Sequence, residues 1–507
     1  MCPWSVPVQR CLAVALIGMM AAIVLDRDAE KVLPALAWLT LAVAALTDRA
    51  RSWRRLGITV GVWALVLGAT GMAAWVAGDF PQAVHGFVRY QVGVIWLAVL
   101  WLALPLVGGA RPWQKSTPMP GSDPRWVGLL MALLLAFAAN ATLSAGASMF
   151  PEESMKLLGN ELLPYAGLTA LAVRWATSSD AGVWWRKGLR GAWVVVVMTA
   201  LGMGVIALTG LVVPALPQHL LEAGFYRVDA DAPDTYRLQF LFHHHNRAGF
   251  FAACALFLAL AGAWGRGWWR WMGVAACAAA AIALPLTLTR AALIAAGAGI
   301  VVFTALGASM SRRGRRIVAV GAVAAVPLMW FGLPDNYREH IAKIVDVSNY
   351  RQGEGGSIGA RFVMWDNAIE MIERRPGLGF GYGFENFEAA AQADHPEIPD
   401  YFKHAVHAHN HWLETAAETG LGGLVLLLAF TVVRIGGLAL AWWRGSRAGY
   451  PMAWLLLLWL SLEVLIQLYG LTNYTLRRNL GYLTYGIWAG SIILAVAAGR
   501  WKRQHVD

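Results

Sequence analysis

Long apolar segments recur along the chain and are separated by short polar ones. Fourteen of them come close to the ~20 residues that a helix needs to cross the hydrocarbon core of a bilayer. They are residues 9–25, 32–47, 56–78, 88–109, 127–148, 160–177, 191–214, 248–264, 271–287, 291–309, 316–333, 420–440, 452–471 and 481–499. Because the segments are continuously apolar rather than alternating, a closed β-barrel is excluded. We predict an all-α polytopic membrane protein with 12–14 transmembrane helices, since residues 271–309 could also form one long or broken helix.

One polar stretch of unusual length interrupts this pattern, from Pro334 to about Thr419. Loops this long are uncommon and usually functional. We therefore predict three parts: an N-terminal transmembrane bundle (1–333), a large catalytic loop (334–419) and C-terminal transmembrane helices (420–507). Within the loop, apolar residues at helical spacing predict a helix from Ser357 to Arg375, which Pro376 and Gly377 end.

Composition and charge agree with a membrane protein. Of the 507 residues, 58% are hydrophobic and only 14% charged, with a mean hydropathy of +0.52, whereas a soluble protein carries about a quarter charged residues. The net charge of +11 does not indicate nucleic acid binding, because the basic residues cluster in alternate short loops. By the positive-inside rule these loops are cytoplasmic, so both termini lie inside and the 334–419 loop projects outward.

The N-terminal apolar run lacks a clear cleavage site, and we interpret it as a first span rather than a removed signal peptide. The cysteines lie at the N-terminus or within predicted spans, so no disulfide framework is implied. They are Cys2, Cys11, Cys254 and Cys277.

Two arginines are candidates for binding an anion at the membrane surface. Arg290 lies in the polar turn between two apolar runs, and Arg361 lies one helical turn before Trp365. An arginine at the end of a span is costly unless it is paired or snorkels to the interface. The alternatives are therefore a snorkelling or solvated arginine and a clamp that binds phosphate oxygens bidentately.

Histidines near the end of the polar loop are candidates for acid–base chemistry. They are His404, His407, His409 and His411. Imidazole is a common metal ligand, but no His-Glu-x-x-His spacing is present, and Glu414 and Glu418 fit the face of a helix. We favour a histidine general base, because an imidazole with an unperturbed pKa of ~6.5 accepts a hydroxyl proton at neutral pH. A polar loop with incidental histidines is the structural alternative.

Two further motifs carry weaker signals. Asp229-Ala230-Asp231 has the carboxylate spacing that metal-dependent glycosyltransferases use, although such residues are more often only solvated. The alternating glycines of residues 377–383 are no P-loop, because no Lys-Ser/Thr pair follows them. They predict a flexible or tightly turning backbone near a substrate.

The segment His409-Asn410, nine residues, Gly420, two residues, Gly423 resembles the characteristic motif of the O-antigen ligase family. Leu288-Thr289-Arg290-Ala291 and Arg361 with Trp365, Pro376 and Gly377 are also similar to that family. His245-Asn246-Arg247-Ala248 resembles a His-Pro-Asn element, with Asn246 in place of proline and Arg247 in place of asparagine. The resemblance covers the chain from His245 onward.

This resemblance implies a glycosyltransferase type C-like membrane fold and an active site facing the periplasm from the bacterial inner membrane. The implied reaction moves O-antigen polysaccharide from undecaprenyl pyrophosphate to a lipid A-core sugar. It inverts the anomeric centre and needs no metal, nucleotide or other cofactor. The implied catalytic residues are His409, Arg290 and Arg361, with Arg247, Asn246, Asn410 and Trp365 in substrate binding and His407 and His411 as alternative bases.

Other functions fit the same motifs. A polysaccharide polymerase or a protein O-oligosaccharyltransferase would use the same donor with a different acceptor. A lipid-glycan transporter is a different class, and it should show paired broken helices and charges at mid-membrane. The concentration of polar residues in one outer loop favours an enzyme.

Overall fold

The computed structural model describes most of the chain. The described residues are 53–107, 124–177, 184–212, 216–229, 232–242, 244–263, 267–307, 335, 338, 357–383, 386–390 and 407–505. In this part of the chain, eight helices are long and apolar enough to cross a membrane, or nine if the bent pair α4 and α5 forms one span. The predicted all-α polytopic membrane class is confirmed.

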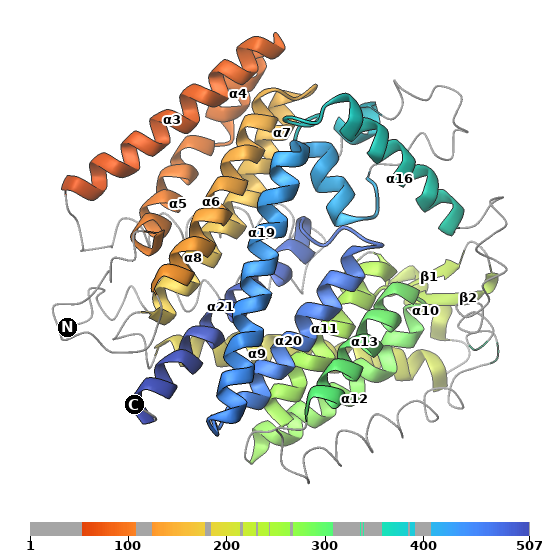
Figure 1. The fold of residues 1–507 in the computed structure, drawn as a ribbon. Coiled ribbons are helices and arrows are strands. Elements are labelled where there is room, and N and C mark those ends of the chain that lie inside the picture. Colours follow the sequence, from red (N-terminus) through yellow and green to blue (C-terminus); the bar gives the residue numbers. More distant parts are fainter. Residues whose placement is uncertain are drawn as a thin grey trace.

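The helices pack around two large apolar cores (Figure 1). The first core is formed mainly by the N-terminal helices, which are α3 (Trp53–Ala77), α4 (Phe80–Arg89), α5 (Val92–Val107), α6 (Pro124–Gly146), α7 (Pro151–Leu157), a π-helix (Leu158–Leu162) and α8 (Leu163–Thr177). The second is formed mainly by α9 (Trp184–Val212), α11 (His245–Ala263), α12 (Trp268–Leu286), α13 (Arg290–Leu306) and α20 (Ala453–Gly470). Helices α19 (His411–Arg447) and α21 (Arg478–His505) contribute to both cores and join them.

The predicted spans agree closely with these helices. Three of the fourteen, 9–25, 32–47 and 316–333, lie outside the described residues, and the other eleven each coincide with a helix. Residues 271–309 form two helices, because the backbone breaks at Thr287–Thr289 and Leu288 has a φ of 51°. The predicted helix of residues 357–375 is α16 (Ser357–Arg374).

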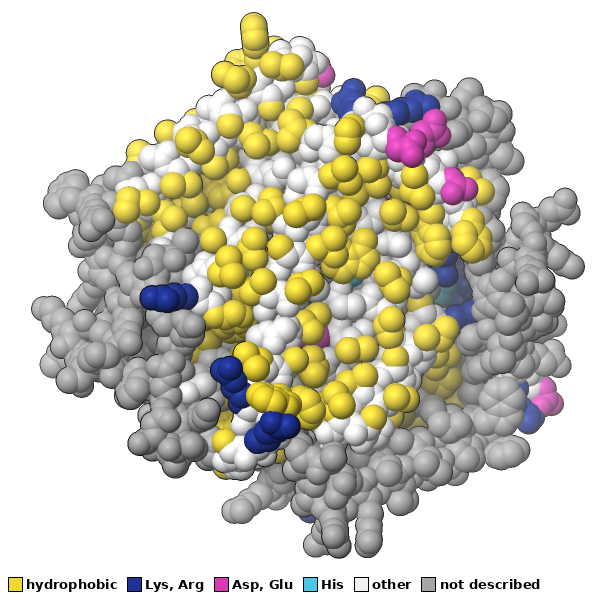
Figure 2. Space-filling model, in the orientation of Figure 1, with side chains coloured by type: hydrophobic (Ala, Val, Ile, Leu, Met, Phe, Trp, Pro, Cys, Tyr) yellow, Lys and Arg dark blue, Asp and Glu magenta, His cyan; other side chains and the backbone are white. Residues whose placement is uncertain are grey.

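The surface is apolar over a wide area, as Figure 2 shows. Large side chains such as Trp75 and Val76 are 73% and 75% exposed. Exposed apolar patches of this extent are unfavourable in water and are typical of a surface in contact with lipid. The protein is therefore a multi-pass membrane protein.

The end of the polar loop is fixed against α19. Helix α19 breaks at Gly420, whose φ of 72° favours glycine and where a Cβ would overlap the carbonyl oxygen of Gly377. The amides of Phe380 and Gly381 donate to the carbonyls of Ala417 and Glu418 at 2.9 and 3.0 Å. The alternating glycines thus form a tight turn that packs along the first part of α19, as their pattern predicted.

Candidate active site

The starts of α11 and α13 lie against each other and against α20. The hydroxyl of Thr289, which precedes α13, donates to the carbonyl of His245 at 3.0 Å. The hydroxyl of Tyr469 in α20 donates to the carbonyl of Asn246 at 2.7 Å. These bonds fix the first turn of α11 and place Arg247 and Arg290 at one end of the bundle.

Arg361, in α16, is the third arginine near Arg247 and Arg290. Burial lowers the pKa of the Arg361 guanidinium, and the nearby positive charge of Arg290 lowers it further, while Tyr469 acts in the opposite direction. Within the described residues, neither Arg290 nor Arg361 forms an ion pair with a carboxylate. Two guanidinium groups therefore share a partly dry site without a described counter-charge, which is the arrangement expected of an anion site. In Figure 2, basic and histidine side chains gather in a recess at the right of the described surface.

His409 lies beside this basic group. Its backbone is in the left-handed region, with a φ of 50°, and its amide donates to Nδ1 of His407 at 3.2 Å. The two rings are 3.9 Å apart between centroids. The Nδ1 atom of His409 is buried and has no hydrogen-bond partner among the described residues. A ring nitrogen in this state is available to take a proton from a substrate.

The predicted titration of His409 near pH ~6.5 is wrong for this site. Burial lowers the pKa of His409 to about 3, and the charge of Arg361 contributes. His244 is itself kept neutral, because burial and then Arg247, Arg227 and Arg237 lower its pKa to about 4. At neutral pH His409 is therefore unprotonated, as a base must be, but it is a weak base until a negative charge arrives.

The remaining predicted residues differ in their surroundings. The side-chain oxygen of Asn410 accepts from the amides of Trp412 at 2.9 Å and Leu413 at 3.3 Å, so Asn410 is the N-cap of α19. His411 is buried against Gly470, and its Nδ1 lies 3.3 Å from the Thr475 hydroxyl, which makes it a poor alternative base. Trp365 packs edge-on against Phe362, and its Nε1 is buried without an acceptor in the described part of the chain.

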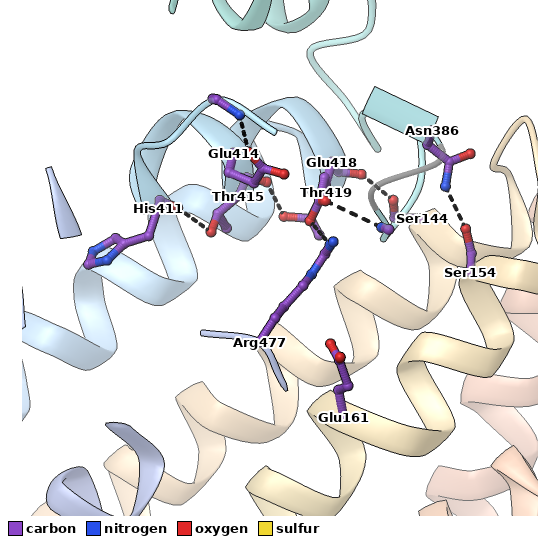
Figure 3. A network of polar contacts seen from close by, with 12 residues as sticks. Ser144, Ser154, Glu161, Asn386, His411, Glu414, Thr415, Glu418, Thr419 and Arg477 are labelled. Atoms are coloured by element: carbon purple, nitrogen blue, oxygen red, sulfur yellow. Dashed lines mark hydrogen bonds and ion pairs between the residues drawn. The ribbon is translucent and has the colours of Figure 1, made fainter. Parts of the chain in front are cut away.

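A second charged cluster supports the His407–Asn410 segment (Figure 3). The Glu414 carboxylate accepts from the amide of Ala408, and that of Glu418 accepts from the amide of Gly383 at 3.3 Å. Glu418 also forms an ion pair with Arg477, and both side chains are only 1% exposed. The Arg477 guanidinium stacks over the ring of Tyr382 at 4.3 Å. Glu418 therefore balances the charge of Arg477, and the pair joins the end of the loop to the α20–α21 connection.

Comparison with known proteins bears on this site directly. The family model described as O-antigen ligase matches residues 275–428, a range that includes Arg290, Arg361 and His409. The match covers 154 of the 507 residues, so this part of the chain is similar to the O-antigen ligase family. Members of this family are transferases of lipid-linked glycans that act as ligases or polymerases.

The chain is also 28% identical to an uncharacterized protein of Haemophilus influenzae over 120 residues. This alignment covers 24% of the chain and 30% of that relative. The similarity therefore spans less than a third of the relative's length and adds no information on the substrate.

The O-antigen ligase match covers five of the seven predicted site residues. Asn246 and Arg247 precede it, and the hydroxyl of Thr289, the residue before Arg290, lies 3.5 Å from Oδ1 of Asn246. Of the runner-up metal motif, Asp231 lies outside the described residues and Asp229 ends strand β1 (Tyr226–Asp229). Within the described residues, no group of three or more His, Cys, Asp or Glu side chains could hold a metal ion.

Several residues of the site were missed in the sequence. His244 and Tyr469 contact the start of α11, and Arg477 neutralises Glu418. The only sequence signal for Arg477 is a charged pair, Arg477-Arg478, directly before an apolar span. That signal is indistinguishable from an ordinary interfacial arginine.

Proposed function

We propose that this O-antigen ligase-type protein transfers O-antigen polysaccharide from undecaprenyl pyrophosphate to a sugar of the lipid A core. The reaction takes place in the periplasmic leaflet of the inner membrane. The observation that carries the proposal is the placement of a buried His409, with one ring nitrogen open, beside two arginines that lack a described carboxylate partner. A pyrophosphate is the doubly charged group that such a pair fits.

In this mechanism Arg290 and Arg361 bind the pyrophosphate and stabilise the charge that develops on it as the glycosidic bond breaks. His409 takes the proton of the acceptor hydroxyl while that oxygen attacks the anomeric carbon. The C–O bond to pyrophosphate breaks as the new C–O bond forms, so one displacement inverts the anomeric centre. The leaving group is already activated, and the mechanism uses no nucleotide or metal.

Binding of the donor also prepares the base. The negative pyrophosphate offsets the charge of Arg361, which is one cause of the low pKa of His409. The imidazole thus becomes more basic when the donor is bound. Proton removal before the donor arrives is disfavoured, which limits futile reactions of the acceptor.

The test is a reconstituted transfer reaction. The purified protein is incubated with a lipid-linked glycan, and lipid A core, a short glycan and a pilin-like protein are offered separately. Transfer to lipid A core with inversion supports the ligase, whereas transfer only to glycan or only to protein assigns the polymerase or the protein transferase. A retained anomeric configuration contradicts the mechanism.

The metal alternative is tested in the same reaction. Chelation should leave the rate unchanged if His409 and the two arginines carry the chemistry. Loss of activity on chelation and its return with Mg²⁺ or Mn²⁺ would instead favour a site at Asp229 and Asp231.

A further inference from the structure

A groove among the N-terminal helices lies apart from the candidate active site. It has a volume of about 700 Å³ and is bounded by α3, the end of α6 and the turn that follows α16. Its walls are mostly apolar, but two charged side chains, Asp79 and Arg375, also line it. At 1.5 Å per residue, Arg375 lies roughly 21 Å along α16 from Arg361. In Figure 1, α3 and the start of α16 lie on opposite sides of the molecule, so the groove is a separate site.

The apolar walls come from facing stripes of two helices. Helix α3 presents residues at i, i+3, i+4, i+7 and i+8, which share one face of a helix. These residues are Ala69, Met72, Ala73, Val76 and Ala77. Helix α6 presents Leu143 and Ala147, one helical turn apart. A Cβ at Gly146 would lie 2.8 Å from the carbonyl oxygen of Thr70, so the two helices touch at one edge of the groove. The small alanine side chains leave a channel roughly 12 Å long beside this contact.

The channel opens to the apolar surface of the protein. Met72 and Val76, which line it, are 69% and 75% exposed. Any apolar face of a membrane helix contacts lipid chains, so these walls alone do not make a specific site. What distinguishes this groove is the pair of opposite charges at one end of it. Asp79 follows the last turn of α3, and Arg375 follows the last turn of α16.

The fold uses neither of these charges in an ion pair. Asp79 is the N-cap of α4, but its carboxylate accepts no hydrogen bond from the first turn, although capping is the usual role of an aspartate there. The Arg375 guanidinium is exposed and stacks over the ring of Phe380 at 4.7 Å. Its neighbour Arg374 is instead ion-paired with Glu370. Within the described residues, Asp79 and Arg375 form no ion pair with each other or with another side chain.

We propose that this groove binds a membrane phospholipid whose headgroup carries both a phosphate and a primary ammonium, as in phosphatidylethanolamine. The phosphate oxygens accept hydrogen bonds from the Arg375 guanidinium, and the ammonium donates to the Asp79 carboxylate. One acyl chain lies in the channel along the alanines of α3. A zwitterionic headgroup matches two opposite charges that share a groove without pairing with each other, whereas a purely anionic lipid leaves Asp79 without a cation.

The lipid contacts the turn that supports the end of the polar loop. Leu378 and Gly379 of this turn line the groove. The carbonyl of Phe380 accepts from the amide of Met149 at 3.4 Å, and the amides of Phe380 and Gly381 donate to the first part of α19. A bound phospholipid therefore stabilises this turn from the side opposite α19. Lipid binding does not depend on the proposed transfer reaction and is measured without turnover.

The test is lipid binding to the full-length protein in detergent, measured by native mass spectrometry. Phosphatidylethanolamine and phosphatidylglycerol with identical acyl chains are titrated separately. The wild type should bind phosphatidylethanolamine about three- to fivefold more tightly, the scale of one partly exposed charge pair. Asp79→Asn should abolish this preference, whereas Arg375→Gln should weaken both lipids and keep it. Equal affinity of the wild type for the two lipids, or a preference that Asp79→Asn leaves intact, would overturn the proposal.

A second variant tests the channel. Ala73→Trp fills the space between α3 and α6 and should weaken binding of both lipids. Leu65→Trp, at an exposed position of α3 outside the groove, is its matched control and should bind like the wild type. Arg374→Gln, beside Arg375 but already ion-paired, should leave both affinities unchanged. If Ala73→Trp lowers the melting temperature, Ala77→Trp at the exposed end of the groove replaces it. Unchanged binding in the tryptophan variant and in Arg375→Gln would mean that only ordinary boundary lipid is present, and the proposal would fall.

Discussion

Two arginine clusters adjoin the His407–Asn410 segment, and they differ in what balances their charge. Arg477 is buried with Glu418 in an ion pair, with Glu414 nearby, and it stacks on Tyr382. Arg361 and Arg290 lie beside His409 without a carboxylate partner in the described part of the chain. Burying an uncompensated charge is costly, whereas a paired one is tolerated. The charge of Arg477 is therefore balanced within the fold, whereas the charges of Arg361 and Arg290 need an anionic ligand to balance them.

The largest expected effect follows the removal of His409, the proposed base beside Arg290 and Arg361. His409→Ala should lower kcat about 10²- to 10⁴-fold, the usual loss for a general base, while the donor still binds through the arginines. Transfer rate and donor affinity are measured on the same preparation. His219→Ala, which removes an exposed histidine paired with Glu222, is the control and should be fully active. Near-normal turnover of His409→Ala would assign the base elsewhere.

The next effect concerns stability and separates the two clusters. Arg477→Met leaves Glu418 and Glu414 buried without their cation and should cost about 3–5 kcal/mol in the free energy of unfolding. Arg361→Met removes a cation that is repelled by Arg290, so it should not lower the melting temperature. Both are measured by thermal unfolding in detergent. Equal destabilisation by the two substitutions would remove the distinction between the clusters.

The arginine clamp gives a smaller but specific loss of activity. Arg290→Ala or Arg361→Ala should each lower the transfer rate at least tenfold, because a charge-assisted contact contributes about 1.5–3 kcal/mol. Lysine in place of either arginine should retain only part of the transfer rate, because it lacks the planar guanidinium that binds two oxygens at once. Arg374→Ala, on the same helix as Arg361 and paired at the surface with Glu370, is the matched control. Wild-type rates in both alanine variants would contradict the clamp.

The pH dependence tests how the basic cluster acts on His409. The base works unprotonated, and its pKa of about 3 means that kcat/KM, which reports the free enzyme, should show no inflection from His409 between pH 5 and 8. A bound pyrophosphate raises the pKa of His409, so the rising limb of kcat should lie at higher pH than that of kcat/KM. Complete pH–rate profiles decide this. Coincident limbs would mean that the donor does not change the charge around His409.

The smallest expected effect concerns Asn410. As an N-cap it should contribute about 1 kcal/mol, so Asn410→Ala should lower the melting temperature slightly. Asn410→Ser keeps an acceptor oxygen and should retain both stability and activity. A serine variant that is stable but inactive would show that Asn410 contacts the substrate.

The parts of the structure that depend on the local sequence pattern could be predicted. Continuous apolar runs predict spans, and the spacing of Phe362, Trp365 and Ile369 predicts α16. The kink at Gly420 falls where the sequence predicted the last part of the chain to begin. The family motif indicated His409, Arg290 and Arg361, and the structure brings them together.

Long-range pairing was not predictable. Nothing in the chain links Arg477 to Glu418, because the pair forms only when α19 and the α20–α21 connection meet. The hairpin that β1 forms with β2 (Ala232–Leu238) was also missed, since its strands are short and lie in a polar loop. Asn410 did carry a readable signal, because an asparagine directly before a helical pattern is a typical N-cap.

The starts of three helices at this site have one more consequence. Helix α11 begins at His245, α13 at Arg290 and α19 at His411, and each start is the positive end of a helix dipole, roughly half an elementary charge. This field attracts anions and opposes protonation of nearby imidazoles, as the arginines do. It belongs to the backbone, so no side-chain substitution removes it. Variants without the arginines should therefore keep a weak affinity for pyrophosphate.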